Sequence, residues 1–153
     1  MITYEKMDIT TVQRGLILHG VNCQGVMGSG VALAIRKKWS DVFPTYQKVC
    51  EAFNDPDTLL GMSHFVRVDE ELYVGNLFTQ KFYGRDGKRY ADPVAVAETL
   101  EEAINYAKTY NLPVYMPRIG CGLGGLDWMT DVLPVVERLA NSNPEVNITV
   151  CDL

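Results

Sequence analysis

The sequence predicts an α/β fold, a three-layer α/β/α sandwich around a central mixed and largely parallel sheet. Strand-like apolar runs alternate along the chain with segments of helical spacing. Two of the predicted strands, 16–21 and 114–116, each lead through a glycine-rich loop into a helix-like segment. A length of 153 residues with 47% hydrophobic and 22% charged residues fits one domain over 1–153 with a substantial core.

The first half of the chain is predicted to hold four strands and two helices. Val31, Ala34 and Ile35 recur at helical spacing, and Pro44 suits the first turn of the helix that follows. Polarity alternates on both sides of the Asp69-Glu70 turn, which predicts a strand pair. The predicted strands cover 2–6, 16–21, 63–68 and 71–78, and the predicted helices cover 29–39 and 44–53.

A long helix opens the second half. Asp92 can cap it, Pro93 suits its first position, and Asn111 with Pro113 ends it. Its apolar stripe consists of Val94, Ala97, Leu100, Ile104 and Ala107. Beyond it we predict strands over 114–116 and 146–151 and a helix over 127–140. Pro134 would kink or break that last helix if it lay in the interior.

Charge and cysteine content exclude several classes of protein. A net charge of −5 argues against a broad nucleic-acid footprint, and we expect no sequence-specific nucleic-acid binding. Arg36, Lys37 and Lys38 fit a solvated helix face, and the alternative is a local basic patch. The four cysteines form no C-x-x-C pair, so we expect free thiols and no metal site. No signal-peptide core or membrane-length apolar run is visible. We therefore expect a soluble, cytoplasmic monomer without membrane contact.

The two glycine-rich loops, 25–31 and 118–125, predict the chemistry. A strand, a loop without bulky side chains and a helix start form an anion site, because free N–H groups and the helix dipole favour negative charge. Two such loops on one parallel sheet can enclose a diphosphate. Neither loop matches the G-x-x-x-x-G-K-[ST] motif or a dinucleotide-binding G-x-G-x-x-G motif with its acidic partner. The sequence therefore argues against a P-loop NTPase and against a dinucleotide-dependent dehydrogenase.

Four segments in order carry a family resemblance. These are 2–9 (ITYEKMDI, with Met7 where glycine is usual), 19–32 (HGVNCQGVMGSGVA), 116–123 (MPRIGCGL) and 148–150 (ITV) with Leu153. They resemble the opening strand, the two binding loops and the last strand of macrodomains, the ADP-ribose-binding modules. The resemblance implies that a macrodomain spans 1–153 and needs no cofactor.

The resemblance also implies a set of substrate-binding residues. They are Asp8, Ile9, Asn22, Gly28, Ser29, Gly30, Val31, Thr79, Gln80, Arg118, Ile119, Gly120, Cys121, Gly122, Leu123, Gly124 and Leu153. Asp8 would accept from the adenine amine, and Asn22 would hold a ribose hydroxyl. From the residues alone, Asp8 equally fits a helix cap and Asn22 a hydrogen bond within its loop.

Two branches of the family share these motifs. Residues 76–84 (NLFTQKFYG) resemble the ADP-ribose 1''-phosphate phosphatases, whereas MPRIGCGL and 124–128 (GGLDW) resemble glycohydrolases that remove ADP-ribose from glutamate or nucleic acid. The glycohydrolase lysine would follow the strand threonine directly, but Gln80 stands there. Lys81 comes one residue later and would point the opposite way on an extended segment, unless a bulge turned it inward.

The candidate catalytic residues are His19, Asp127 and Lys81. His19 ends a buried strand, where it would position water or protonate a leaving oxygen, and the alternative is a structural histidine. Asp127 fits a base or a helix N-cap. In the polar stretch after the strand over 71–78, Arg85 or Lys88 would meet a terminal phosphate, or the stretch is an exposed turn around Asp86-Gly87.

These features predict a hydrolase that binds ADP-ribose or ADP-ribose 1''-phosphate and releases phosphate from the latter. The alternatives are an ADP-ribosyl hydrolase acting on modified protein or nucleic acid and a reader of ADP-ribosylated macromolecules without catalysis.

Overall fold

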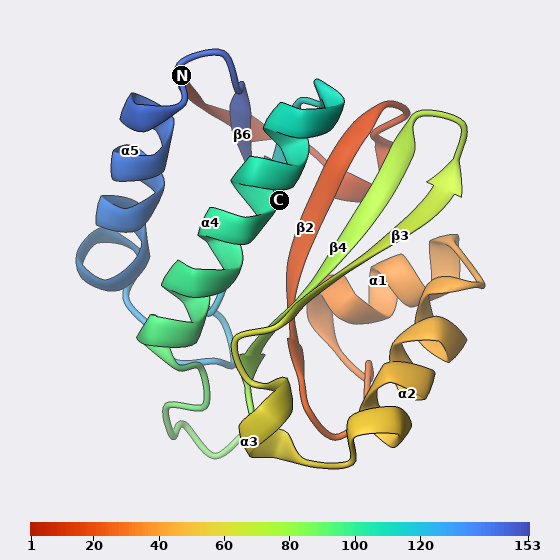
Figure 1. The fold of residues 1–153 in the computed structure, drawn as a ribbon. Helices are drawn as coiled ribbons and strands as arrows, with labels where there is room; N and C mark the ends of the chain where they lie inside the picture. The colour runs from red at the N-terminus through yellow and green to blue at the C-terminus, as the bar shows by residue number, and fades with distance from the viewer.

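A six-stranded sheet in the order β1-β6-β5-β2-β4-β3 forms the centre of the molecule (Figure 1). The computed structural model describes all residues 1–153. Neighbouring strands run parallel except β3, which pairs antiparallel with β4. The predicted mixed and largely parallel sheet is therefore confirmed.

All the predicted strands are present. Those over 2–6 and 114–116 have the predicted bounds, and the ends of the others are shifted by no more than two residues. They are β1 (Ile2–Lys6), β2 (Gly15–Asn22), β3 (Ser63–Asp69), β4 (Leu72–Gln80), β5 (Val114–Met116) and β6 (Ile148–Asp152). The helices are α1 (Gly30–Lys38), α2 (Val42–Phe53), α3 (Pro56–Leu59), α4 (Pro93–Tyr110) and α5 (Leu133–Ser142). A 3-10 turn, η1 (Ile9–Thr11), and a π-helical turn, η2 (Trp128–Val132), complete the elements.

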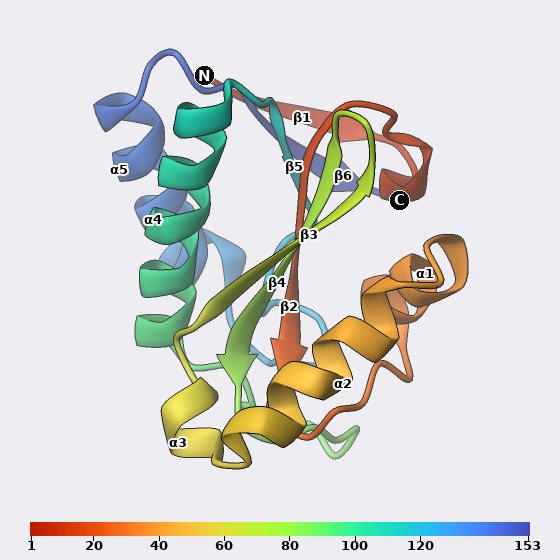
Figure 2. The ribbon, with the colours of Figure 1, turned by 45° about the vertical axis from the view of Figure 1, so that its right-hand side comes forward.

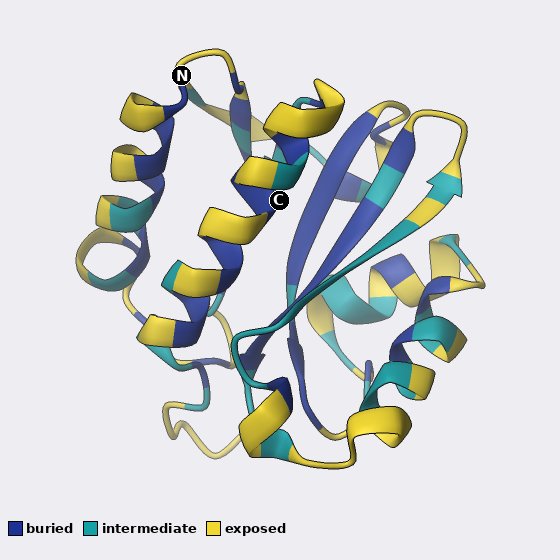
Figure 3. Cartoon of the chain, viewed as in Figure 1, coloured by how far each residue is buried: buried dark blue, intermediate teal, exposed yellow.

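Helices cover both faces of the sheet and create two cores (Figure 2). Leu16 and Leu18 of β2 pack with α4 and α5, whereas Ile17 and Val21 pack with α1, α2 and α3 on the opposite face. This alternation follows from the two-residue period of a strand. The central strands are buried and the outward helix faces are exposed (Figure 3), as a three-layer sandwich requires.

Local sequence signals explain where the helices of the second half begin and end. The Asp92 carboxylate accepts hydrogen bonds from the N–H groups of Val94 (2.8 Å) and Ala95 (3.2 Å), and Asn111 ends α4 at a φ of 54°. The predicted helix over 127–140 is divided instead. Pro134 lies in the first turn of α5, where no backbone donor is needed, and the π-helical turn η2 precedes it.

The carboxyl ends of β2, β4 and β5 lie at one edge of the sheet because these strands are parallel neighbours. Both glycine-rich loops and the chain segment after β4 leave the sheet at this edge, where parallel α/β folds bind ligands. None of the helices combines the length and the apolar character needed to cross a bilayer.

Candidate functional site

A pocket of about 450 Å³ opens at this edge of the sheet. Three segments surround it: the first loop (residues 23–29, after β2), the second loop (residues 117–127, after β5) and the post-β4 segment (residues 81–91). The predicted site residues that line it are His19, Asn22, Gly28, Ser29, Gly30, Val31, Thr79, Gln80, Arg118, Ile119, Gly120, Gly122, Leu123 and Gly124.

The first loop presents a run of free backbone donors to the pocket. The N–H groups of Met27, Gly28 and Ser29 donate no hydrogen bond, and neither do those of Gly30, Val31 and Ala32 at the start of α1. Ser29 occupies the N-cap position, but its side chain does not cap the helix. The positive end of α1 is therefore open to a ligand, which is the arrangement that binds phosphate.

The second loop contributes donors from the opposite side. The N–H groups of Gly120, Gly122, Leu123 and Gly124 have no hydrogen-bond acceptor. Cys121 differs from them, because its N–H donates to the Arg118 carbonyl oxygen at 3.1 Å and its side chain lies outside the pocket. Burial raises the pKa of its thiol to about 11, so the group stays uncharged at neutral pH.

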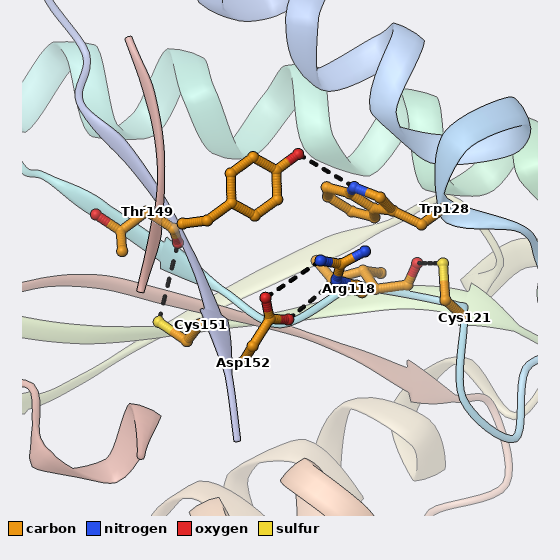
Figure 4. A network of polar contacts seen from close by, with 8 residues as sticks. Arg118, Cys121, Trp128, Thr149, Cys151 and Asp152 are labelled. Atoms are coloured by element: carbon orange, nitrogen blue, oxygen red, sulfur yellow. Dashed lines mark hydrogen bonds and ion pairs between the residues drawn. The ribbon is translucent and has the colours of Figure 1, made fainter. Parts of the chain in front are cut away.

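Charged groups on the pocket wall favour an anionic ligand. The lining includes two arginines and no carboxylate, although the whole chain carries a net charge of −5. Arg118 forms two hydrogen bonds with Asp152, at 3.0 and 3.2 Å, and lies 5.5 Å from the Trp128 ring (Figure 4). Its guanidinium therefore holds the second loop to the last strand. Arg85 makes no ion pair and is free to meet a ligand.

His19 lines the pocket but is almost wholly buried, with a relative exposure of 1%. Its Nε2 is 2.6 Å from Asn76 Oδ1, while His19 Nδ1 and Asn76 Nδ2 have no partner. Burial lowers the pKa of the imidazole to about 4, so the ring is neutral at physiological pH. A neutral ring that donates to Asn76 from Nε2 keeps Nδ1 as an acceptor. A catalytic role for His19 stays a prediction.

The family follows from comparison with known proteins. The family model described as "Macro domain" matches residues 18–133. This chain belongs to the macrodomain family. It is 30% identical to the "ADP-ribose 1''-phosphate phosphatase" of Scheffersomyces stipitis, across 84% of this chain and 89% of that protein.

Two further similarities of this chain involve a longer curated protein and a solved structure. It is 29% identical to the "DNA ADP-ribosyl glycohydrolase" of Mycobacterium tuberculosis, but the match spans only 36% of that longer protein. The solved macrodomain of Mycobacterium tuberculosis DarG superposes with a TM-score of 0.85 at 25% identity, covering 100% of this chain and 98% of that one.

Two candidate catalytic residues of this macrodomain lie outside the pocket lining. The Lys81 amine pairs with Asp57 of α3, which agrees with the expectation that its side chain points away. Asp127 accepts a hydrogen bond from the Thr130 N–H at 3.0 Å and so caps η2. The capping interpretation of Asp127 is confirmed, and neither side chain reaches a ligand in this conformation.

Besides Cys121, three predicted binding residues lie outside the lining. Asp8 caps η1 through the Thr10 N–H (2.9 Å) and hydroxyl (2.7 Å), and these bonds lower the pKa of its carboxyl. Ile9 is buried in the core, and Leu153 is exposed at the end of the chain. Asp8 is therefore a helix cap, which is the alternative that the residues alone also allowed.

The sequence left two alternatives for the post-β4 segment, a contact with a terminal phosphate or an exposed turn. Tyr83, Gly84 and Arg85 line the pocket, so the segment borders the site and is more than an exposed turn. Lys88 instead pairs with Asp86 at 3.8 Å and does not line the pocket. The topology could have identified this segment as part of the site, because the segment follows β4, the strand that pairs with β2. Gly20, Val26 and Met27 also line the pocket and had not been singled out.

Proposed function

We propose that this macrodomain binds ADP-ribose with its diphosphate between the first and second loops. The observation that carries the proposal is two sets of free N–H groups on the same pocket: those of Met27 to Ala32 in the first set, and those of Gly120, Gly122, Leu123 and Gly124 in the second. Such fixed donors stabilise phosphate oxygens without reorganisation. The absence of carboxylates from the lining supports the same ligand class.

We further propose that it hydrolyses ADP-ribose 1''-phosphate. Water attacks the terminal phosphorus, and the bond from phosphorus to the ribose oxygen breaks. The attacking water gives up one proton and the departing ribose oxygen takes one up, so that ADP-ribose and phosphate form. Arg85 is the free cation that would hold the terminal phosphate, and the loops would fix the rest of the substrate. The similarity to the Scheffersomyces stipitis phosphatase over 89% of its length supports this activity.

Removal of ADP-ribose from DNA is the second candidate, favoured by the similarity to the mycobacterial glycohydrolase. That chemistry would need a nucleophile or base near the distal ribose. Lys81 is paired with Asp57 outside the pocket, and Asp127 is occupied as a cap. The phosphatase proposal requires neither of these side chains, and we therefore rank it first.

Phosphate release from ADP-ribose 1''-phosphate tests the proposal, with Arg85→Ala as the decisive variant. We expect release by the wild type and a loss of about 10-fold or more in kcat/KM for Arg85→Ala, because one charge-assisted contact to phosphate is removed. Arg89→Ala is the matched control, since Arg89 belongs to the same segment but does not line the pocket. Its activity should equal that of the wild type.

Three outcomes would count against parts of this account. A wild type that binds ADP-ribose but releases no phosphate would refute the phosphatase. Equal losses in Arg85→Ala and Arg89→Ala would remove the specific role of Arg85. Release of ADP-ribose from modified DNA, without phosphate release, would favour the second candidate. His19→Ala in the same assay tests the predicted catalytic role of His19.

A further inference from the structure

A tyrosine beneath the first loop is not explained by packing alone. Tyr46 lies on α2, is fully buried, and stacks on Phe78 of β4 with a centroid distance of 5.8 Å. A phenylalanine would fill the same space. The hydroxyl must therefore be explained by its partners, because a buried polar group is costly unless it is bonded.

Those partners all belong to the first loop and the strand end that leads into it. The Tyr46 hydroxyl lies 2.7 Å from the Asn22 carbonyl oxygen and 2.8 Å from Asn22 Oδ1, which share its single proton. It accepts a hydrogen bond from the Gly25 N–H at 3.1 Å. Burial raises the pKa of this hydroxyl, so it remains a donor at physiological pH.

Asn22 extends the same network along the loop. Its Oδ1 accepts from the Gln24 N–H at 2.9 Å and the Val26 N–H at 3.4 Å, and its Nδ2 donates to the Val26 carbonyl oxygen at 2.8 Å. The Asn22 amide is thus engaged within the protein, as in the alternative that the sequence allowed. The predicted bond from Asn22 to a ribose hydroxyl would compete with these contacts.

The network divides the first loop into two parts. The N–H groups of Gln24, Gly25 and Val26 are bonded to Tyr46 or Asn22, whereas those of Met27 through Ala32 are free and border the pocket. One half of the loop is therefore fixed and the other half is left for a ligand. Fixing donors before binding raises affinity, because less conformational entropy is lost on binding.

We infer that Tyr46 is a positioning residue for the ligand site, acting through Asn22 on the free donors of the first loop. The inference rests on the proposed binding of ADP-ribose. Without the hydroxyl, Gly25 loses its acceptor and the fixed half of the loop loosens. The ring would still pack on Phe78, so the fold should persist.

Calorimetric titration of ADP-ribose into Tyr46→Phe tests this inference. We expect the Kd to rise about tenfold, the change typical of losing one buried hydrogen bond. Tyr106→Phe is the matched control: the Tyr106 ring stacks on Phe65 at 4.0 Å on the opposite face of the sheet, and its hydroxyl forms no hydrogen bond. Its Kd should equal that of the wild type.

Hydrogen exchange gives a second measurement that does not require ligand. The amides of Gln24, Gly25 and Val26 should exchange faster in Tyr46→Phe, while those of α4 should be unchanged. A merely structural role would lower the melting temperature without changing the Kd of the folded variant. An unchanged Kd would overturn the inference.

The two proposals fail in different ways. If the wild type does not bind ADP-ribose, the proposed function fails, and exchange in the first loop still decides whether Tyr46 positions it. Unchanged exchange at Gln24, Gly25 and Val26 would then overturn the inference as well.

Discussion

At the scale of single residues, His19 shows how burial sets the charge of a group near the site. Its side chain has one polar partner, Asn76, and two nitrogen atoms of the pair have none. Charging the ring would place a positive charge on a buried group that no counter-ion contacts. The imidazole pKa accordingly falls to about 4, and a neutral ring is the form available to any reaction at neutral pH.

This shift predicts how folding stability depends on pH. Well above pH 6.5, the ordinary pKa of a histidine side chain, the ring is neutral in both the folded and the unfolded state. Between pH 6.5 and about pH 4 the unfolded chain binds a proton that the folded chain excludes. Stability attributable to His19 should therefore be lost as pH falls through this window, by about 3 kcal/mol in total.

Denaturant unfolding of the wild type and His19→Gln at several pH values measures this contribution. The difference between their free energies of unfolding should change by about 3 kcal/mol between pH 7 and pH 4. His64 is present in both proteins and its contribution cancels. Parallel stability curves for the two proteins would show that burial does not lower the pKa of His19 in the folded state.

At the scale of elements, the sequence was informative where local chemistry determines the backbone. Asp92 and Asn111 limit α4 as predicted, because a cap and a left-handed residue act on their own neighbours. The short elements η1 and α3 were not predicted, since three or four residues carry no periodicity. The division at Pro134 was foreseen as a break, but the π-helical turn that accommodates it depends on tertiary packing.

The second loop also depends on a close approach that only glycine permits. A Cβ on Gly124 would lie 2.6 Å from the Gly120 carbonyl oxygen and 3.0 Å from Ala91 Cβ. The loop cannot easily move away, because the Gly124 carbonyl oxygen accepts hydrogen bonds from Tyr90 and Ala91. Gly124→Ala should lower stability by about 1–3 kcal/mol and weaken ADP-ribose binding.

Gly122→Ala is the control for this substitution, since a Cβ at Gly122 meets nothing within 4 Å. Thermal unfolding should show a clear decrease in melting temperature for Gly124→Ala and almost none for Gly122→Ala. Equal melting temperatures for the two variants would contradict the role assigned to the close approach.

At the scale of the whole molecule, the site joins segments far apart in the sequence. The glycine-rich loops were predictable because their own residues carry the signal. The Arg118–Asp152 pair and the Tyr46–Asn22 network were not, because each depends on tertiary proximity that no local pattern encodes. Arg118 and Asn22 both line the pocket, but the polar groups of their side chains are bonded to Asp152 and Tyr46 within the protein.

An amide-resolved NMR titration with ADP-ribose tests the central claim most directly, because it reports each backbone donor separately. The largest shifts should fall on the free amides from Met27 through Ala32 and on Gly120, Gly122, Leu123 and Gly124. The bonded amides of Gln24, Gly25 and Val26 should shift less. Saturable binding whose shifts lie elsewhere, or no binding, would contradict the account.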